Sequence, residues 1–197
     1  PWTSLRVHYF WLPLIGLFTV ARLDEIVRLQ RRDIKQTPEM PAWSKKKDNS
    51  RHGIWYMDIT ASEKGLKNKA SHRVIPLHPY LIAIGLIEYI SDFEPDEFIF
   101  PHYGKMKYTK ASDMFRDYRR AVGVGRQENE DTGEDLVFHT FRHTLADTFK
   151  GRFVPDTVSR EIMGHSPGKD VHANTYEKNH SIDTLFDKGI MVLDYYV

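Results

Sequence analysis

The feature that most constrains the fold is an apolar run near the start of the chain, which reads YFWLPLIGLFTV over Tyr9–Val20. The run is shorter than the ~20 residues that a membrane-spanning helix needs, and Pro13 and Gly16 interrupt it. Its apolar residues cover nearly all sides of a helix, which is typical of a helix inside a protein core. We therefore expect residues 5–20 to form a buried core helix, and we expect no membrane partner.

Length and composition limit the remaining possibilities. The chain has 197 residues, which indicates one domain, and it contains no cysteine. Disulfide frameworks, thiolate nucleophiles and cysteine-ligated zinc are therefore excluded, and a reducing compartment is expected. Motifs that bind nucleotide phosphates through glycine-rich loops are absent, and so is the Gly-x-Ser-x-Gly turn of many hydrolases. We expect no cofactor.

The net charge of +1 conceals alternating blocks of charge. Residues 28–73 carry 12 Lys and Arg against 5 Asp and Glu, and residues 105–127 carry 7 against 2. Residues 74–104 and 128–136 each carry 5 acidic residues and no Lys or Arg. The basic blocks are either solvated surface or a face that binds the phosphates of nucleic acid.

Hydrophobic periodicity predicts a mostly helical α+β fold with a small antiparallel sheet. Two β-rich runs, 53–59 and 72–77, are expected to form a hairpin with a cationic tip. Helical patterns are expected from Arg22 onward, over 79–90, over 109–122 and in the region that follows the acidic loop around 128–135.

One histidine pair raises the question of a metal. His139 and His143 have the i, i+4 spacing of a zinc-binding helix, but Thr140 occupies the position of the catalytic glutamate in such helices. We therefore expect no metal site. His139 and Arg142 would instead share one face of a first helical turn, where an imidazole and a guanidinium can bind one phosphate. Taken alone, this pair is more typical of an exposed helix start.

Four segments in this order resemble the catalytic domain of tyrosine recombinases, the family of phage-type integrases. They are ARLDEIVRL over 21–29, KNKASHRVIPL over 67–77, HTFRHT over 139–144, and MGHS over 163–166 followed by NTY over 174–176. The resemblance covers essentially the whole chain. Two departures are visible: Val20 stands where the family usually has Gly, and the interval from His165 to Tyr176 is a couple of residues longer than usual.

The resemblance implies a DNA-breaking and rejoining fold and metal-independent cleavage through a 3′-phosphotyrosyl intermediate. Tyr176 would be the nucleophile and His139 its base, while Lys67 would be the general acid, with Lys64 and Lys69 as the other choices. Arg22, Arg142 and His165 would bind the scissile phosphate. A type IB topoisomerase, or a DNA-binding module that has lost its activity, are the alternatives.

The resemblance also implies partners and domain organisation. Residues 1–197 would be a single catalytic domain, the C-terminal part of a longer integrase that lacks its N-terminal DNA-binding domain. The partners would be double-stranded DNA at recombination sites, further copies of the chain in a tetramer, and accessory DNA-bending proteins, in the bacterial cytoplasm. Residues 182–197 either pack on their own core or dock on a neighbouring protomer. The residues expected to contact DNA are Lys45, Lys46, Lys47, Lys64, Lys69, Arg73, Lys107 and Lys110.

Overall fold

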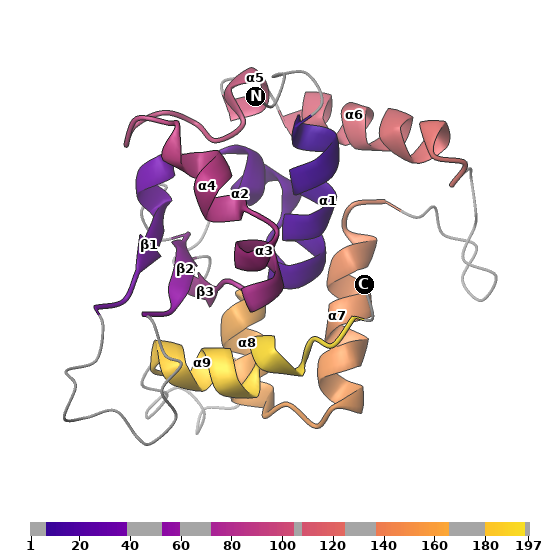
Figure 1. The fold of residues 1–197 in the computed structure, drawn as a ribbon. Helices are drawn as coiled ribbons and strands as arrows, with labels where there is room; N and C mark the ends of the chain where they lie inside the picture. Colours follow the sequence, from indigo (N-terminus) through magenta and orange to yellow (C-terminus); the bar gives the residue numbers. More distant parts are fainter. Residues whose placement is uncertain are drawn as a thin grey trace.

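The apolar run forms helix α1 (Val7–Thr19), which lies at the centre of the computed structural model (Figure 1). The structure describes residues 7–38, 53–59, 72–104, 108–124, 137–165 and 180–195. Trp11, Leu12 and Ile15 of α1 are fully buried, and the helix packs against α2 (Leu23–Val27), α3 (Pro79–Ala83) and α7 (Thr140–Gly151). The predicted buried core helix is confirmed.

A three-stranded antiparallel sheet lies on one side of α1 (Figure 1). Its strands, in spatial order, are β1 (Ile34–Gln36), β2 (Trp55–Asp58) and β3 (Val74–Pro76). Met57 pairs with Ile34 on one side and with Ile75 on the other, and all three side chains are buried. The predicted pairing of β2 with β3 is confirmed, whereas β1 was not predicted. The described residues are otherwise mostly helical, as the α+β class requires.

The helix predicted over residues 79–90 is in fact two helices, α3 and α4 (Leu86–Ser91). Gly85 separates them with φ of 96°, a left-handed conformation that glycine adopts without steric cost. The apolar period continues across this break, because both helices bury their apolar side chains in the same core. Periodicity alone therefore predicted one helix where there are two.

The remaining helices pack around the rest of the core. Helix α6 (Tyr108–Ala121) confirms the predicted basic helix and packs on α2. The other elements are η1 (Arg31–Asp33), α5 (Pro101–Gly104), α8 (Asp156–Met163), α9 (Ile182–Lys188) and η5 (Ile190–Val192). In the part of the chain that the structure describes, we find no helix with both the length and the apolar character to cross a membrane.

The C-terminal segment packs on its own chain. Helix α9 contacts β3 and α8, and Leu185, Ile190 and Leu193 are buried in the core. Met191 of the same segment is exposed. Residues 182–195 thus pack on their own core, and docking on a neighbouring protomer stays a prediction.

Candidate active site

Arg22 stands at the start of helix α2, as predicted. Its backbone N–H donates to Glu25 Oε2 (2.7 Å), and its Nη1 donates to Glu25 Oε1 (2.8 Å). The carboxylate thus accepts a hydrogen bond from one of the N–H groups that a helix start leaves without an intrahelical partner. The Glu25 side chain is only 2% exposed, whereas 40% of the Arg22 side chain is exposed. Glu25 therefore anchors Arg22 and leaves its side chain accessible.

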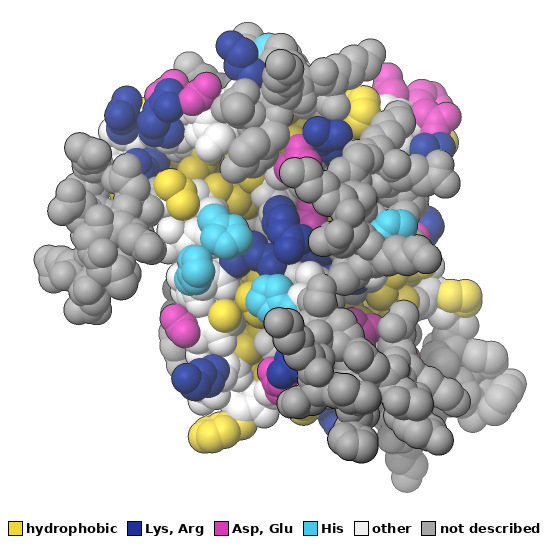
Figure 2. Space-filling model, turned by 180° about the vertical axis from the view of Figure 1, so that it is seen from behind, with side chains coloured by type: hydrophobic (Ala, Val, Ile, Leu, Met, Phe, Trp, Pro, Cys, Tyr) yellow, Lys and Arg dark blue, Asp and Glu magenta, His cyan; other side chains and the backbone are white. Residues whose placement is uncertain are grey.

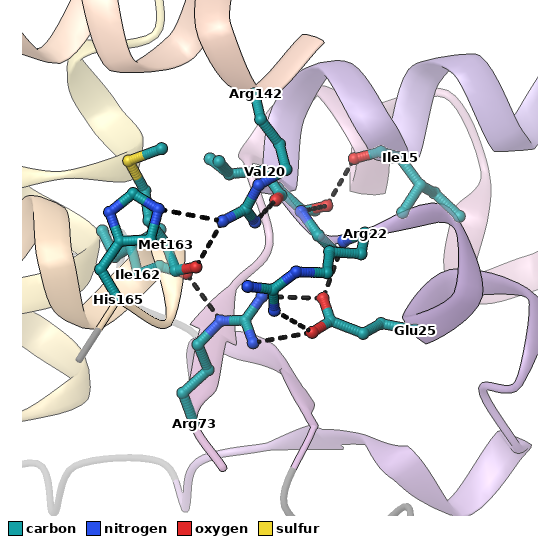
Figure 3. Close-up of polar contacts among 11 residues, drawn as sticks. Ile15, Val20, Arg22, Glu25, Arg73, Arg142, Ile162, Met163 and His165 are labelled. Carbon is teal, nitrogen blue, oxygen red and sulfur yellow. Dashed lines mark hydrogen bonds and ion pairs between the residues drawn. The ribbon is translucent and has the colours of Figure 1, made fainter. Parts of the chain in front are cut away.

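The turn before Arg22 is strained. Val20 has φ of 61°, a left-handed conformation that is rare for a β-branched residue and costs about 1–3 kcal/mol. Glycine, which the family that the sequence resembles usually has at this position, adopts such a conformation without steric cost. The turn directs the Val20 carbonyl at Arg142 Nη1, which donates a hydrogen bond to it (Figure 3). The strained turn thus places Arg22 and Arg142 next to each other.

Arg142 lies in the first turn of α7, and its side chain is buried. Besides the Val20 carbonyl, it donates to the Met163 carbonyl from Nη2 (2.7 Å), and the same nitrogen lies 3.4 Å from His165 Nε2 (Figure 3). Burial, and then the charges of Arg22 and Arg73, lower the pKa of Arg142 to about 10. The guanidinium is therefore still charged at neutral pH.

His165 follows the C-terminus of helix α8. Gly164 ends this helix with φ of 63°, and the N–H groups of Gly164 and His165 donate to the carbonyls of Glu161 and Arg160 (3.1 and 3.0 Å). This is the glycine-dependent helix ending that satisfies the last carbonyls of a helix. It turns the chain so that the His165 ring reaches Arg142.

Arg73 lies elsewhere than predicted. It was expected to contact DNA, but its side chain is only 3% exposed and forms a buried ion pair with Glu25 (Nη2 to Oε2, 2.8 Å). Its Nε donates to the Ile162 carbonyl (2.8 Å), so it connects β3 with both α2 and α8 (Figure 3). In this position its Nε, Nη1 and Nη2 all donate to protein acceptors, namely the Ile162 carbonyl and the Glu25 carboxylate.

Two imidazoles border the arginines. Burial, and then the charge of Arg142, lower the pKa of both His139 and His165, and Arg22 adds to the effect at each. Both rings are therefore mostly neutral at pH 7, and a neutral imidazole can accept a proton or donate its ring N–H. His139 also lies beside His143, with ring centroids 5.1 Å apart. The described residues contain no group of three or more His, Asp or Glu side chains suited to a metal ion.

The charges of this cluster do not cancel. Three guanidinium groups, those of Arg22, Arg73 and Arg142, surround the single carboxylate of Glu25. Burial alone would raise the pKa of Glu25, but hydrogen bonds and charge from Arg73, and then Arg22, bring it below its usual value. Figure 2 shows the result on the surface, where Lys and Arg side chains gather at the centre of one face with histidines beside them. Such an excess of positive charge favours an oxyanion.

The structure thus brings together Arg22, His139, Arg142 and His165, four of the six predicted catalytic residues. Lys110 is exposed on α6. The other two predicted catalytic residues, Lys67 and Tyr176, are outside the described residues. The same is true of most of the residues predicted to contact DNA: Lys45, Lys46, Lys47, Lys64, Lys69 and Lys107.

Sequence reasoning missed Glu25 as a member of the site. The signal was present, because a Glu three residues after the start of a helix is the position from which a carboxylate caps it. The partnership of Glu25 with Arg73, 48 residues away, left no comparable local signal. Comparisons with known proteins add no further indication: neither a family model, nor a curated protein, nor a solved structure matches the chain significantly.

Proposed function

We propose that the chain is the catalytic domain of a tyrosine site-specific recombinase, an integrase of a phage or another mobile element. One observation carries the proposal: Arg22, Arg142 and His165 come from three distant segments and converge on one cationic site, with His139 beside them. These are the residues that the four-segment resemblance assigns to the scissile phosphate.

The site is suited to a phosphodiester. Arg22 is accessible, and Arg142 is held by two backbone carbonyls, so their guanidinium groups would bind the two non-bridging oxygens of the phosphate. Their charges would stabilise the additional negative charge of the pentacovalent transition state. The His165 ring would donate a further hydrogen bond to the same phosphate.

In the proposed reaction, the energy of the cleaved phosphodiester bond is kept in a phosphotyrosyl ester and is used to rejoin the strands. The Tyr176 hydroxyl attacks the scissile phosphorus, its proton passes to neutral His139, and the new P–O bond forms a 3′-phosphotyrosine. The bond from phosphorus to the 5′-oxygen breaks, and that oxygen takes a proton from Lys67. In the reverse sense, the 5′-hydroxyl of a second strand attacks phosphorus, its proton returns to Lys67, and Tyr176 leaves with a proton from His139.

The proposal extends to the partners of the chain. Double-stranded DNA would lie along the basic blocks, with exposed Lys110 as one of its contacts. Recombination joins two duplexes, so we propose that the chain acts as a tetramer on DNA, together with accessory DNA-bending proteins, in the cytoplasm. Contacts of this kind go to phosphates, which makes binding strongly salt-dependent.

Trapping the covalent intermediate tests the proposal. The protein is incubated, in the presence of EDTA, with nicked duplexes taken from the DNA that flanks its gene, and the protein–DNA adduct is measured on a denaturing gel. We expect an adduct with the parent protein and none with Tyr176→Phe. An adduct that forms equally with Tyr176→Phe would show that another group is the nucleophile, and loss of the adduct in EDTA would show that a metal is needed.

Two further measurements separate the roles and the alternatives. A substrate whose 5′-bridging oxygen is replaced by sulfur has a leaving group that needs no acid, so it should restore cleavage by Lys67→Ala; no restoration would remove Lys67 as the general acid. Strand exchange between two duplexes distinguishes a recombinase from a topoisomerase, which would relax supercoiled DNA without exchange.

A further inference from the structure

Arg73, like Arg142, is a buried side chain that contacts both halves of the candidate site. Its Nη1 and Nη2 donate to the two oxygens of Glu25 (3.1 and 2.8 Å), and its Nε donates to the Ile162 carbonyl (2.8 Å). Glu25 anchors Arg22, and Ile162 lies three residues before His165. A single guanidinium therefore connects the start of α2 with the end of α8.

The end of helix α8 is shaped around this side chain. A Cβ atom added to Gly164 would lie 2.7 Å from Arg73 Nη1 and 2.9 Å from its Cζ, closer than any side chain could approach. Adjacent carbonyls at this helix end accept from two different arginines: Ile162 from Arg73, and Met163 from Arg142. The position of His165 is thus fixed relative to both guanidinium groups.

Arg73 also determines how much charge Arg22 retains for a ligand. Each Glu25 oxygen accepts from both arginines: Oε1 from the two Nη1 groups, and Oε2 from the Arg22 N–H and Arg73 Nη2. Without Arg73, the carboxylate would neutralise Arg22 alone. With Arg73 present, the three groups together carry one net positive charge, and of the three side chains only that of Arg22 is accessible.

We propose, resting on the function proposed above, that Arg73 is a positioning residue of the phosphate site. It holds Arg22 through Glu25, and it holds His165 through the end of α8, so that both reach one oxyanion. Only a guanidinium fits this role, because three donors in a fixed plane must point to a carboxylate and to a carbonyl at once. A lysine has one nitrogen and cannot span both partners.

The test compares Arg73→Lys with Arg152→Lys, the same exchange at an exposed residue outside the site. Inorganic phosphate is titrated into each protein, and the imidazole NMR signals of His139 and His165 report binding. We expect Arg73→Lys to weaken phosphate binding by about tenfold or more, and Arg152→Lys to leave it unchanged. Arg73→Lys leaves the buried Glu25 carboxylate poorly paired, so this variant is at risk of not folding. In that case the measurement is repeated with the double variant Arg73→Gln/Glu25→Gln, which buries no charge at these two positions.

A double-mutant cycle distinguishes positioning from a general structural role. The rate of the covalent DNA adduct is measured for Arg73→Lys, Arg22→Met and the double variant. Because Arg73 acts in part through Arg22 and in part through the end of α8, its exchange should slow the parent protein about tenfold or more. It should slow the Arg22→Met protein by a clearly smaller factor. Equal slowing in both backgrounds, or phosphate binding that Arg73→Lys leaves unchanged, would overturn the proposal.

The two proposals fail in different ways. If the parent forms no DNA adduct but phosphate binding depends on Arg73, the positioning of an oxyanion site stands and the recombinase function does not. If the parent forms the adduct and both Arg73 variants match its rate and its phosphate binding, the function stands and Arg73 has no part in it.

Discussion

Arg73 and Arg142 of the candidate site differ from Arg116 of helix α6 in what holds them. The Arg116 side chain on α6 is 46% exposed, and it pairs with Asp113 and Asp117 of its own helix (2.7 and 3.4 Å). The Arg73 side chain is 3% exposed and bonds to two other elements, and Arg142 is buried with bonds to carbonyls of two distant segments. The same residue type is thus adjustable at Arg116 and fixed at Arg73 and Arg142.

The physical reason is the cost of burying charge. An exposed ion pair contributes about 0–1 kcal/mol, because water solvates the separated charges almost as well. A buried pair contributes little compared with apolar residues, but removing one partner costs about 3–5 kcal/mol, since the remaining charge has lost its water. Buried arginines therefore tolerate one geometry only, which is what a phosphate site requires.

The largest expected effect is on catalysis by Arg142. Arg142→Lys removes the planar donor pair but keeps the charge, so we expect the covalent-adduct rate to fall by about 10²–10³, or about 3–4 kcal/mol. The matched exchange Arg116→Lys on α6 should change the rate by less than about twofold, because the ion pair of Arg116 with Asp113 is exposed to solvent. A single-turnover assay at saturating DNA measures both. Equal losses at the two positions would remove the distinction between them.

The next effect concerns stability at Glu25. Glu25→Gln removes the carboxylate that lies between Arg22 and Arg73, so we expect the free energy of unfolding to fall by about 3–5 kcal/mol. Asp113→Asn, which removes the carboxylate opposite Arg116, should cost less than about 1 kcal/mol. Urea unfolding followed by circular dichroism gives both values. A loss below about 1 kcal/mol at Glu25 would mean that its burial carries no penalty.

A smaller effect is expected at the glycine that ends α8. Gly164→Ala combines a left-handed φ with a Cβ too close to Arg73, so we expect a loss of about 1–3 kcal/mol and a lower adduct rate. Gly151, the last residue of α7, has no atom within 4 Å of an added Cβ. Gly151→Ala should therefore be neutral or stabilise by up to about 1 kcal/mol. Thermal unfolding compares the two, and a stabilising Gly164→Ala would contradict the close approach.

The smallest effect is a dependence on pH. Burial and neighbouring arginines lower the pKa of His139 and His165, so the folded protein binds fewer protons than the unfolded chain below the ordinary histidine pKa of 6.5. Stability from these groups is complete above pH 6.5 and decreases as the pH falls from there toward the lowered pKa values. Imidazole NMR titration should show both pKa values rising in Arg22→Met and not in Arg116→Met. Unchanged values in Arg22→Met would show that the cluster does not act on its histidines.

Much of the local structure follows from the sequence. The apolar run predicts α1, the acidic residues after Arg22 predict a helix start, and the β-branched runs predict β2 and β3, because each signal lies within a few neighbouring residues. Strand β1 was missed since only Ile34 of its three side chains is buried, which leaves no alternation to recognise. Arg73 was misplaced because a cationic residue in a basic block is usually exposed.

The sequence by itself determined which residue types are available: the arginines, the histidines and the glycine that ends α8, in an order that resembles a known catalytic family. Only the tertiary structure decided that Arg73 is a buried link and that Val20 adopts a left-handed turn. The reason is distance along the chain. The bonds that make the site join residues 48, 89 and 122 positions apart, and only the packed core, not local periodicity, brings such residues together.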